Sequence, residues 1–204
     1  MKIAVCMKWV PDPEYPFQAT IDGIRLDTPG LTYLANPLDM VACEAAVRLR
    51  ELAGGTVTVV TVGPAAADAG LRAGLALGAD AATRIAFENG GIDGGDSAAR
   101  LLASAISADS PDVIICGVRS SDSGSGAVPA ILAERLGIPL VTNVVSLAGA
   151  APLEIERRMD GGRRQQIQVH PPVAITVEAS LCDPRYPSVL SRRKADRAVI
   201  DVRT

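Results

Sequence analysis

Short runs of apolar, mostly β-branched residues alternate with amphipathic stretches along roughly the first 140 residues of the chain. The apolar runs predict buried strands at residues 2–7, 56–62, 82–86 and 112–116. Between and after them, apolar positions at helical spacing predict helices at residues 40–52, 65–77, 97–108 and 129–136. Asp39 and Asp96 stand where they would cap the first and third of these helices. Alternating strands and helices imply right-handed crossovers and a parallel sheet with helices on both faces.

The pattern changes after residue 140. Residues 141–147 are extended, and the apolar alternations at 153–158 and 165–169 flank Asp160-Gly161, which predicts a β-hairpin. Residues 173–177 predict another aliphatic strand, and the tail from 181 reads as a loop, a basic segment and a strand-like stretch at 199–202. An earlier hairpin is predicted at 18–27. The expected fold is a three-layer α/β/α sandwich with a mainly parallel sheet and a C-terminal β-hairpin excursion.

The stretch 117–139, GVRSSDSGSGAVPAILAERLGIP, follows the fourth predicted strand and carries the main candidate for binding chemistry. Small polar residues come first, and a helical pattern begins with Pro129 in its first turn and ends at Gly137. A strand, a small polar loop and a helix N-terminus together present free backbone N–H groups to an anion. The stretch therefore predicts a phosphate-binding loop. The alternative is an ordinary glycine-serine turn, because the pair Gly124 and Gly126 is only part of a dinucleotide fingerprint.

Composition narrows the function classes. The net charge of −3 gives no indication of a nucleic-acid surface. No run approaches the ~20 apolar residues of a membrane span, and nothing resembles a signal peptide, so we expect no membrane insertion and a cytoplasmic location. The four cysteines form no CxxC pair, and Cys6 and Cys116 are expected to pack as small hydrophobic residues. His170, the one histidine, lacks the partners for a zinc cluster or a Ser-His-Asp system and is expected to be structural or exposed.

Several segments together resemble the β subunit of electron transfer flavoprotein, including its FixA-type bacterial members. The opening KIAVCMKWVPDP is similar to the family's first strand and the K-x-V-P/I-D that follows it. The segments ANPLD, VGP and ERRMDGG match family motifs in the same order, and DPRYP followed by KA matches the family's (E/N)-P-R-Y…K-A. The likeness extends from residue 2 to about residue 202.

The resemblance implies an adenine-nucleotide α-hydrolase-like fold, also seen in universal stress proteins, and an electron-carrier subunit rather than an enzyme. The expected partners are an electron transfer flavoprotein α subunit, which shares the redox FAD, and flavin dehydrogenases such as acyl-CoA dehydrogenases. Electrons would leave to a quinone oxidoreductase or to ferredoxin. The β subunit itself would hold AMP, or a second FAD in bifurcating members, while the protein supplies binding and orientation.

The family's nucleotide contacts carry over to Cys6, to Asn36, and to Val62 with the adjoining Gly63. The others fall in the loop, at Asp122, Ser123, Gly124, Ser125, Gly126, Ala127 and Val128. The family's loop has the form G-x-Q-x-x-D-x-D-x-x-Q, and this chain has Arg119, Gly124 and Ala127 in place of the first glutamine, the second aspartate and the second glutamine. A phosphate would then be held mainly by backbone N–H groups, with Arg119 adding charge, and the ligand is open among AMP, FAD, another nucleotide or none.

The segment from 185 to 194 resembles the loop with which the family's β subunit docks onto dehydrogenases. The expected docking residues are Arg185, Tyr186, Val189, Leu190 and Lys194, with Val189 or Leu190 in the place of the family's inserted leucine. Considered without the family, these aliphatic residues would more often pack on their own domain. We therefore expect a nucleotide-binding domain at 1–180, and at 181–204 a docking loop with a truncated C-terminal tail.

Two other functions compete with this expectation. The altered loop and the short tail favour a stand-alone adenine-nucleotide-binding module without a redox role, whereas the docking segment argues against it. A hydrolase on the same fold has little support, because the chain has no GxSxG elbow and no nucleophile–base pair.

Overall fold

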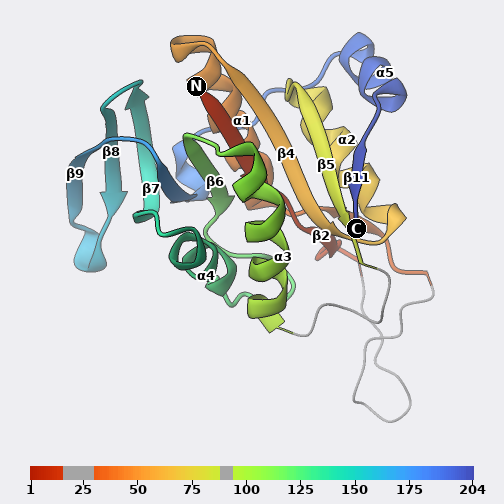
Figure 1. Cartoon of the computed structure of the whole chain (residues 1–204), viewed down its shortest axis with the longest axis horizontal. Coiled ribbons are helices and arrows are strands. Elements are labelled where there is room, and N and C mark those ends of the chain that lie inside the picture. Colours follow the sequence, from red (N-terminus) through yellow and green to blue (C-terminus); the bar gives the residue numbers. More distant parts are fainter. Residues whose placement is uncertain (16–29, 88–93) are drawn as a thin grey trace.

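The computed structural model describes residues 1–15, 30–87 and 94–204, and the hairpin predicted at 18–27 lies outside them. The strands of the main sheet are β1 (Lys2–Cys6), β4 (Thr56–Gly63), β5 (Ala81–Ala86), β6 (Val113–Gly117), β7 (Leu140–Gly149), β8 (Leu153–Arg158), β9 (Arg164–Val169), β10 (Val173–Val177) and β11 (Asp201–Arg203). Within the described residues these form one nine-stranded sheet in the order β11-β5-β4-β1-β6-β10-β7-β8-β9 (Figure 1).

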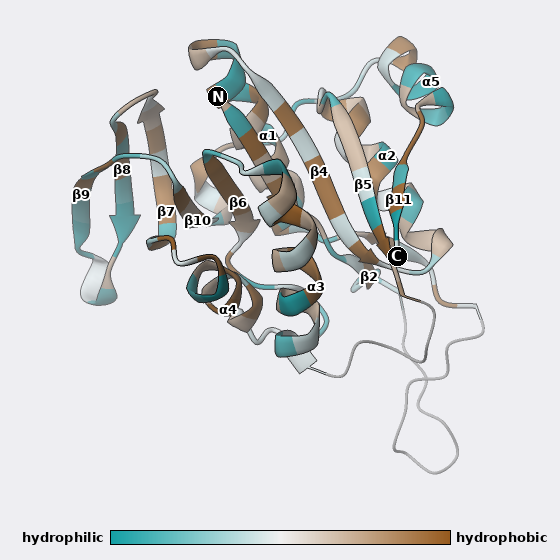
Figure 2. Ribbon diagram, viewed as in Figure 1, coloured by the Kyte–Doolittle hydropathy of each residue, from teal (hydrophilic) through white to brown (hydrophobic). Residues whose placement is uncertain are grey.

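The sheet is parallel from β11 to β7, and its described antiparallel pairings are β7–β8 and β8–β9. The predicted mainly parallel sheet with a hairpin excursion is therefore confirmed. The hairpin continues the sheet beyond the helices at one end, and Figure 2 shows it as more hydrophilic than the central strands. This difference follows from burial, because central parallel strands are covered on both faces.

Helices cover the two faces of the sheet in pairs. They are α1 (Pro37–Ala53), α2 (Asp68–Leu77), α3 (Gly94–Asp109), α4 (Ala127–Leu136) and, beside α2, α5 (Val189–Arg197). Along β1, Ile3 and Val5 belong to the core cluster under α1 and α2, whereas Ala4 and Cys6 belong to the cluster under α3 and α4. Side chains alternate between the two faces of each strand, so one strand contributes apolar residues to both cores of the three-layer sandwich.

Two predicted helix caps are wrong. The helix predicted from residue 40 begins at Pro37, and its N-cap is Asn36. Asp39 lies inside the first turn and is only 6% exposed, because two strand ends use its carboxylate as described below. Asp96 likewise lies inside the first turn of α3, and its carboxylate pairs with Arg135 of α4 at 2.6 Å.

Two stretches predicted as loops have regular structure. The segment after β1 forms β2 (Trp9–Pro11), which pairs antiparallel with β3 (Tyr33–Ala35) in a separate small sheet. In the tail, Val189 and Leu190 begin α5 rather than continuing a loop, since the Ser188 side chain accepts a hydrogen bond from the Ser191 N–H at 3.0 Å and caps the helix.

Candidate functional site

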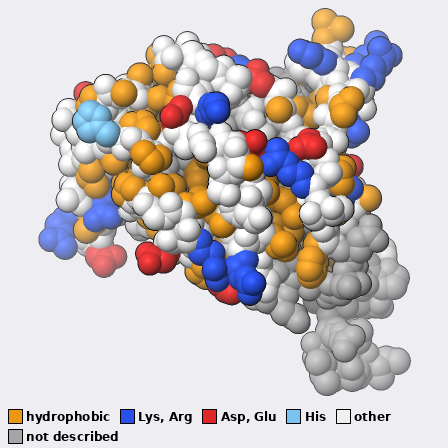
Figure 3. Space-filling model, viewed as in Figure 1, with side chains coloured by type: hydrophobic (Ala, Val, Ile, Leu, Met, Phe, Trp, Pro, Cys, Tyr) orange, Lys and Arg blue, Asp and Glu red, His pale blue; other side chains and the backbone are white. Residues whose placement is uncertain are grey.

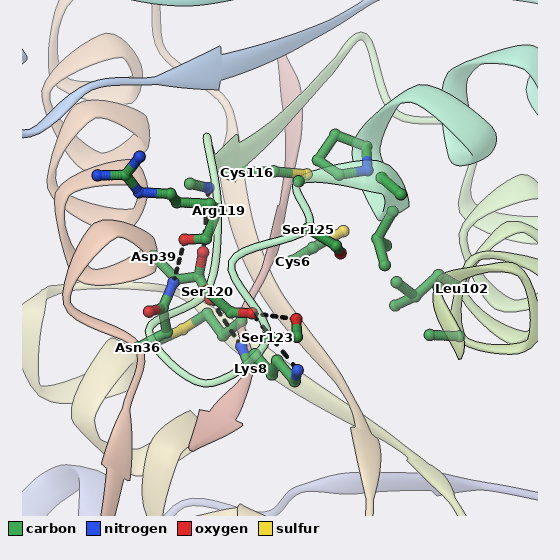
Figure 4. Close-up of a pocket in the computed structure, with 18 of the residues that line it drawn as sticks. Cys6, Lys8, Asn36, Asp39, Leu102, Cys116, Arg119, Ser120, Ser123 and Ser125 are labelled. Carbon is green, nitrogen blue, oxygen red and sulfur yellow. Dashed lines mark hydrogen bonds between the residues drawn. The ribbon is translucent and has the colours of Figure 1, made fainter. Parts of the chain in front are cut away.

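A cavity of about 360 Å³ lies at the C-terminal ends of β1, β4 and β6, under the N-terminal ends of α3 and α4 (Figure 4). The carboxyl ends of parallel strands are the usual place for a ligand in an open α/β sheet. Its lining comes from the strand ends, from the segment after β6 and from three helix starts: Cys6, Met7, Lys8, Asn36, Asp39, Val62, Gly94, Gly95, Ala98, Leu102, Cys116, Gly117, Arg119, Ser120, Ser123, Ser125, Gly126, Ala127, Val128 and Pro129.

One end of the cavity is apolar. Cys6 and Cys116 face each other in register on β1 and β6 and form its floor, and Leu102 of α3 forms a wall. Both cysteines are buried, as their apolar surroundings predict. Contact with Cys6 and burial raise the pKa of the Cys116 thiol well above its ordinary value, so this thiol stays protonated. The slot therefore suits a flat, uncharged ring such as a nucleobase.

The other end is polar and is organised by Asn36. This side chain is 1% exposed, and its amide donates to the carbonyl of Arg119 at 3.0 Å and accepts from the Ser121 N–H at 3.1 Å. Both hydrogen bonds hold the loop after β6 against the N-terminus of α1, although 83 and 85 residues separate the partners. Asn36 therefore positions the loop that lines the cavity.

Asp39 links the two strands that form the floor. Its carboxylate accepts hydrogen bonds from the Lys8 N–H at 2.8 Å and from the Gly117 N–H at 3.0 Å, just beyond β1 and at the end of β6. Burial raises the pKa of Asp39 to about 6, although hydrogen bonds from these N–H groups and from Asn36 act in the opposite direction. The close approach also explains Gly117, since a Cβ there would lie 2.6 Å from an Asp39 oxygen.

An ion pair stands at the polar end. The Lys8 ammonium lies 2.6 Å from the Asp122 carboxylate and 3.4 Å from the Ser120 hydroxyl. Partial burial opposes ionisation of Asp122, but hydrogen bonds from Lys8, Ser120 and the Ser123 N–H outweigh it and hold the Asp122 pKa below its ordinary value. Lys8 thus brings a positive charge to the cavity lining, and Asp122 neutralises it from just outside.

Backbone N–H groups add a second source of positive potential. Helix α4 starts after Gly126, which adopts a left-handed conformation with φ of 61° and offers no side-chain cap. A Cβ on Gly126 would lie 2.8 Å from the Val118 carbonyl oxygen, so the tight turn into the helix requires glycine. Gly94 and Gly95, at the start of α3, line the same cavity. Two helix N-termini therefore point their dipoles toward one place, which favours an anion.

The cavity brings together most of the nucleotide contacts inferred from the sequence. Three expected contacts, Gly63, Asp122 and Gly124, lie outside its lining, and the others line it: Cys6, Asn36, Val62, Ser123, Ser125, Gly126, Ala127 and Val128. Arg119 also lines it, but Figure 4 shows its side chain turned away from Cys6 and Cys116.

Sequence reasoning missed Lys8, Asp39 and the wall from α3. Lys8 had a signal, because a cation directly after a first buried strand stands where such sheets bind ligands. Leu102 had none, since its place depends on how α3 packs. Among the described residues, no group of three or more His, Cys, Asp or Glu side chains is arranged to hold a metal ion, and His170 is exposed.

A nucleotide fits these surroundings in kind and in size. The apolar slot suits an adenine ring, and the helix starts with Lys8 suit a phosphate. The volume of about 360 Å³ lies near the lower end of the range of roughly 300–1,000 Å³ for small-molecule sites. The cavity therefore has the size of a small-molecule site and a lining that suits a nucleotide.

A second surface feature lies at the start of α5. The docking patch, named for the role that the sequence predicts and defined as Tyr186, Val189 and Leu190, is 89%, 68% and 77% exposed, respectively. Arg192 stands over the Tyr186 ring at 5.0 Å from its centroid. Figure 3 shows apolar side chains beside Lys and Arg side chains in this region, and the exposed basic residues around the patch are Arg192, Arg193, Lys194 and Arg197.

Arg185 holds the chain before this patch on α1. Its guanidinium donates to Glu44 at 2.9 Å and to Glu51 at 2.7 Å. Hydrogen bonds to Glu51 and Glu44 raise the Arg185 pKa. Burial acts to raise the Glu44 pKa, but the hydrogen bonds from Arg185 and Arg48 outweigh it and hold the Glu44 pKa below its ordinary value. Arg185 thus ties the segment that carries the patch to α1, and its expected part in docking stays a prediction.

Comparison with known proteins is consistent with this geometry. No described helix has both the length and the apolar character needed to traverse a bilayer. The chain matches the electron transfer flavoprotein domain over residues 26–204. It is 37% identical over 195 residues to the electron transfer flavoprotein subunit beta of Thermoanaerobacterium thermosaccharolyticum. The aligned region covers 93% of this chain and 72% of that relative.

Two further relatives carry related names. The chain is 33% identical over 216 residues to Protein FixA of Azorhizobium caulinodans, with 98% of this chain and 74% of the relative covered. It is 32% identical over 190 residues to the acryloyl-CoA reductase electron transfer subunit gamma of Anaerotignum propionicum, with 91% and 71% covered. The resemblance inferred from the sequence is thereby confirmed, and the chain belongs to the electron transfer flavoprotein family, among relatives named as its β subunit and as FixA.

Proposed function

We propose that this chain is the nucleotide-binding subunit of a heterodimeric electron carrier, in which an α subunit supplies the redox FAD. The observation that carries the proposal is the cavity at the ends of β1, β4 and β6, whose lining combines the apolar Cys6, Cys116 and Leu102 with Lys8 and the starts of α3 and α4. We assign AMP, or the AMP half of a second FAD, to it. The flavin supplies the electron-transfer chemistry, and this chain binds, orients and excludes water.

The residues of the cavity divide the binding task. Cys6, Cys116 and Leu102 enclose the base, and the N–H groups at the start of α4 face the phosphate. The family's amide side chains are replaced in the loop, so the phosphate is held by backbone N–H groups and by charge. Asn36 and Asp39 hold the loop and the strand ends in place through hydrogen bonds to the backbone.

The docking patch is proposed to bind the dehydrogenases that donate electrons. An apolar centre in a basic rim suits an acidic surface with an apolar pocket, because the charges steer encounter and the buried centre holds the complex. Acyl-CoA-linked donors are the favoured class, since one relative is named as an electron transfer subunit of an acryloyl-CoA reductase. Electrons then pass to a quinone oxidoreductase or to ferredoxin.

Co-expression with the α subunit from the same genome tests the proposal. We expect a stable 1:1 complex, and extraction of its ligands distinguishes two forms of the site. One flavin with one AMP per heterodimer indicates simple electron transfer, and two flavins indicate a bifurcating carrier. A chain that stays monomeric in the presence of the α subunit and binds ATP alone contradicts the proposal and favours a stand-alone nucleotide-binding module.

A further inference from the structure

Lys8 is the cation best placed to meet an anion at the polar end of the cavity. Among the described residues that line the cavity, the cationic ones are Lys8 and Arg119. Figure 4 shows Arg119 turned away from the floor, whereas Lys8 extends along the loop toward Ser120 and Ser123. Of the two cations, Lys8 is therefore the one available to a phosphate in the cavity.

The backbone of Lys8 is fixed while its ammonium is free to change partners. The Lys8 N–H donates to Asp39 at 2.8 Å, and its carbonyl accepts from the Asn36 N–H at 2.9 Å. The side chain is 48% exposed, and a lysine stem has several rotatable bonds. The ammonium can thus move by a rotamer change without disturbing β1.

The present partner of that ammonium is itself an anion. Asp122 lies 2.6 Å from Lys8, is 29% exposed and also accepts from the Ser123 N–H. Asp122 stands outside the cavity lining, whereas Lys8 belongs to it, so a ligand in the cavity would have to share Lys8 with Asp122. A phosphate that reaches Lys8 meets a charge that is already neutralised, and the phosphate and the carboxylate repel each other.

We infer that Lys8 is the side chain that recognises the nucleotide phosphate and that Asp122 competes with the phosphate for it. The inference rests on the proposed nucleotide site and adds a specificity determinant to it. The pair sets how strongly the site prefers a phosphorylated nucleoside: Lys8 increases the preference and Asp122 limits it. Adenosine, which lacks the phosphate, should be indifferent to both residues.

Calorimetry of the full-length chain with AMP and with adenosine tests the inference. Lys8→Met should weaken AMP binding about five- to tenfold, the size expected for one half-exposed charged contact, and should leave adenosine binding unchanged. Asp122→Asn should strengthen AMP binding about fivefold, also without an effect on adenosine. In the Lys8→Met background, Asp122→Asn should strengthen AMP binding by clearly less than about fivefold, because only the direct repulsion between the Asp122 carboxylate and the phosphate remains.

Matched controls separate the local effect from net charge. Lys2→Met makes the same charge change at the opposite end of β1, where the Lys2 ammonium contacts the carbonyl of Asp109 at 3.3 Å, and should leave AMP binding unaltered. If wild-type protein binds AMP and Lys8→Met binds it equally well, Lys8 is not the phosphate contact and the inference is overturned. If wild-type protein binds neither AMP nor FAD, the proposed nucleotide site and the inference fall together.

Discussion

Substitution of Asp39 measures how much the buried carboxylate at the site lowers the free energy of unfolding. We consider Asp39→Asn, which keeps the shape of the side chain and removes its charge. In the wild-type protein both carboxylate oxygens accept backbone N–H groups, from Lys8 at 2.8 Å and from Gly117 at 3.0 Å. An asparagine accepts one of them and turns its NH₂ toward the other, as the protonated carboxyl group of Asp39 does with its O–H at low pH, so the variant and the wild type should be close in stability at pH 4.

A rise in pH destabilises the wild-type protein relative to the variant. Burial raises the Asp39 pKa from 3.8 to about 6, so the folded state disfavours the ionised form. The contribution of Asp39 to stability is therefore full below pH 3.8 and is lost as the pH rises through about 6. At 1.36 kcal/mol per pH unit, the loss between pH 4 and pH 7.5 amounts to about 2.5 kcal/mol. Asparagine does not titrate, so the variant lacks this loss.

Urea unfolding, followed by far-UV circular dichroism at several pH values from 4 to 7.5, measures the difference. We expect Asp39→Asn to be close to wild type in stability at pH 4 and to gain about 2.5 kcal/mol relative to it by pH 7.5. Asp196→Asn, at an exposed position on α5, controls for the removal of one formal charge. A stability difference between wild type and Asp39→Asn that is the same at all pH values would refute the reasoning.

Three further tests address the loop, the ion pair of Glu44 with Arg185, and the docking patch. Gly126→Ala and Gly124→Ala both place alanine at positive φ, at a cost of about 1–2 kcal/mol. The new Cβ meets a backbone oxygen, at 2.8 Å, only at position 126, so only Gly126→Ala should abolish AMP binding in calorimetry. Equal AMP binding by the two variants would exclude the loop from the binding site. Glu44→Gln should lower the urea-derived stability by about 1.5–3 kcal/mol through weaker bonds to Arg48 and Arg185, and an unchanged midpoint would contradict the stabilising role of these bonds. Leu190→Ser should weaken binding to the electron-donating dehydrogenase about tenfold in surface plasmon resonance without lowering stability. The control Leu52→Ser, at a 74% exposed position on α1, should leave this binding unchanged. Equal effects of the two substitutions on binding would show that the patch is not part of the interface.

The strands of the sheet could be predicted because their signal is local. A run such as TVTVVTV is β-branched throughout, and it becomes β4 with only the bordering glycine added. The loop after β6 could be placed for the same reason, since a strand, small polar residues and Pro129 follow one another directly in the sequence. The hairpin was marked by its Asp160-Gly161 turn.

The misplaced residues share a different cause. Asp39, in the first turn of a helix, looks like a cap, but the ends of β1 and β6 approach within hydrogen-bonding distance, and burial makes these bonds the stronger demand. The pairing of Lys8 with Asp122 spans 114 residues and depends on how Asn36 folds the loop back. The start of α5 was hidden because prolines precede it and its helix is strongly polar, so only the Ser188 cap marks it.

Binding and folding are coupled in this site through the N-terminus of α1. Asn36 and Asp39 are 1% and 6% exposed, and their side-chain hydrogen bonds go to the backbone of the loop and of the strand ends. These bonds hold the loop and the strand ends where the cavity forms. Part of the entropy cost of ordering the site is therefore incurred when the chain folds and not when a ligand binds. The burial of an ionised Asp39 works against folding near neutral pH, which means that the site is maintained at the expense of stability. A ligand that binds only the folded state returns stability by mass action, and the folded chain should therefore be most dependent on its nucleotide at the pH where Asp39 is fully ionised.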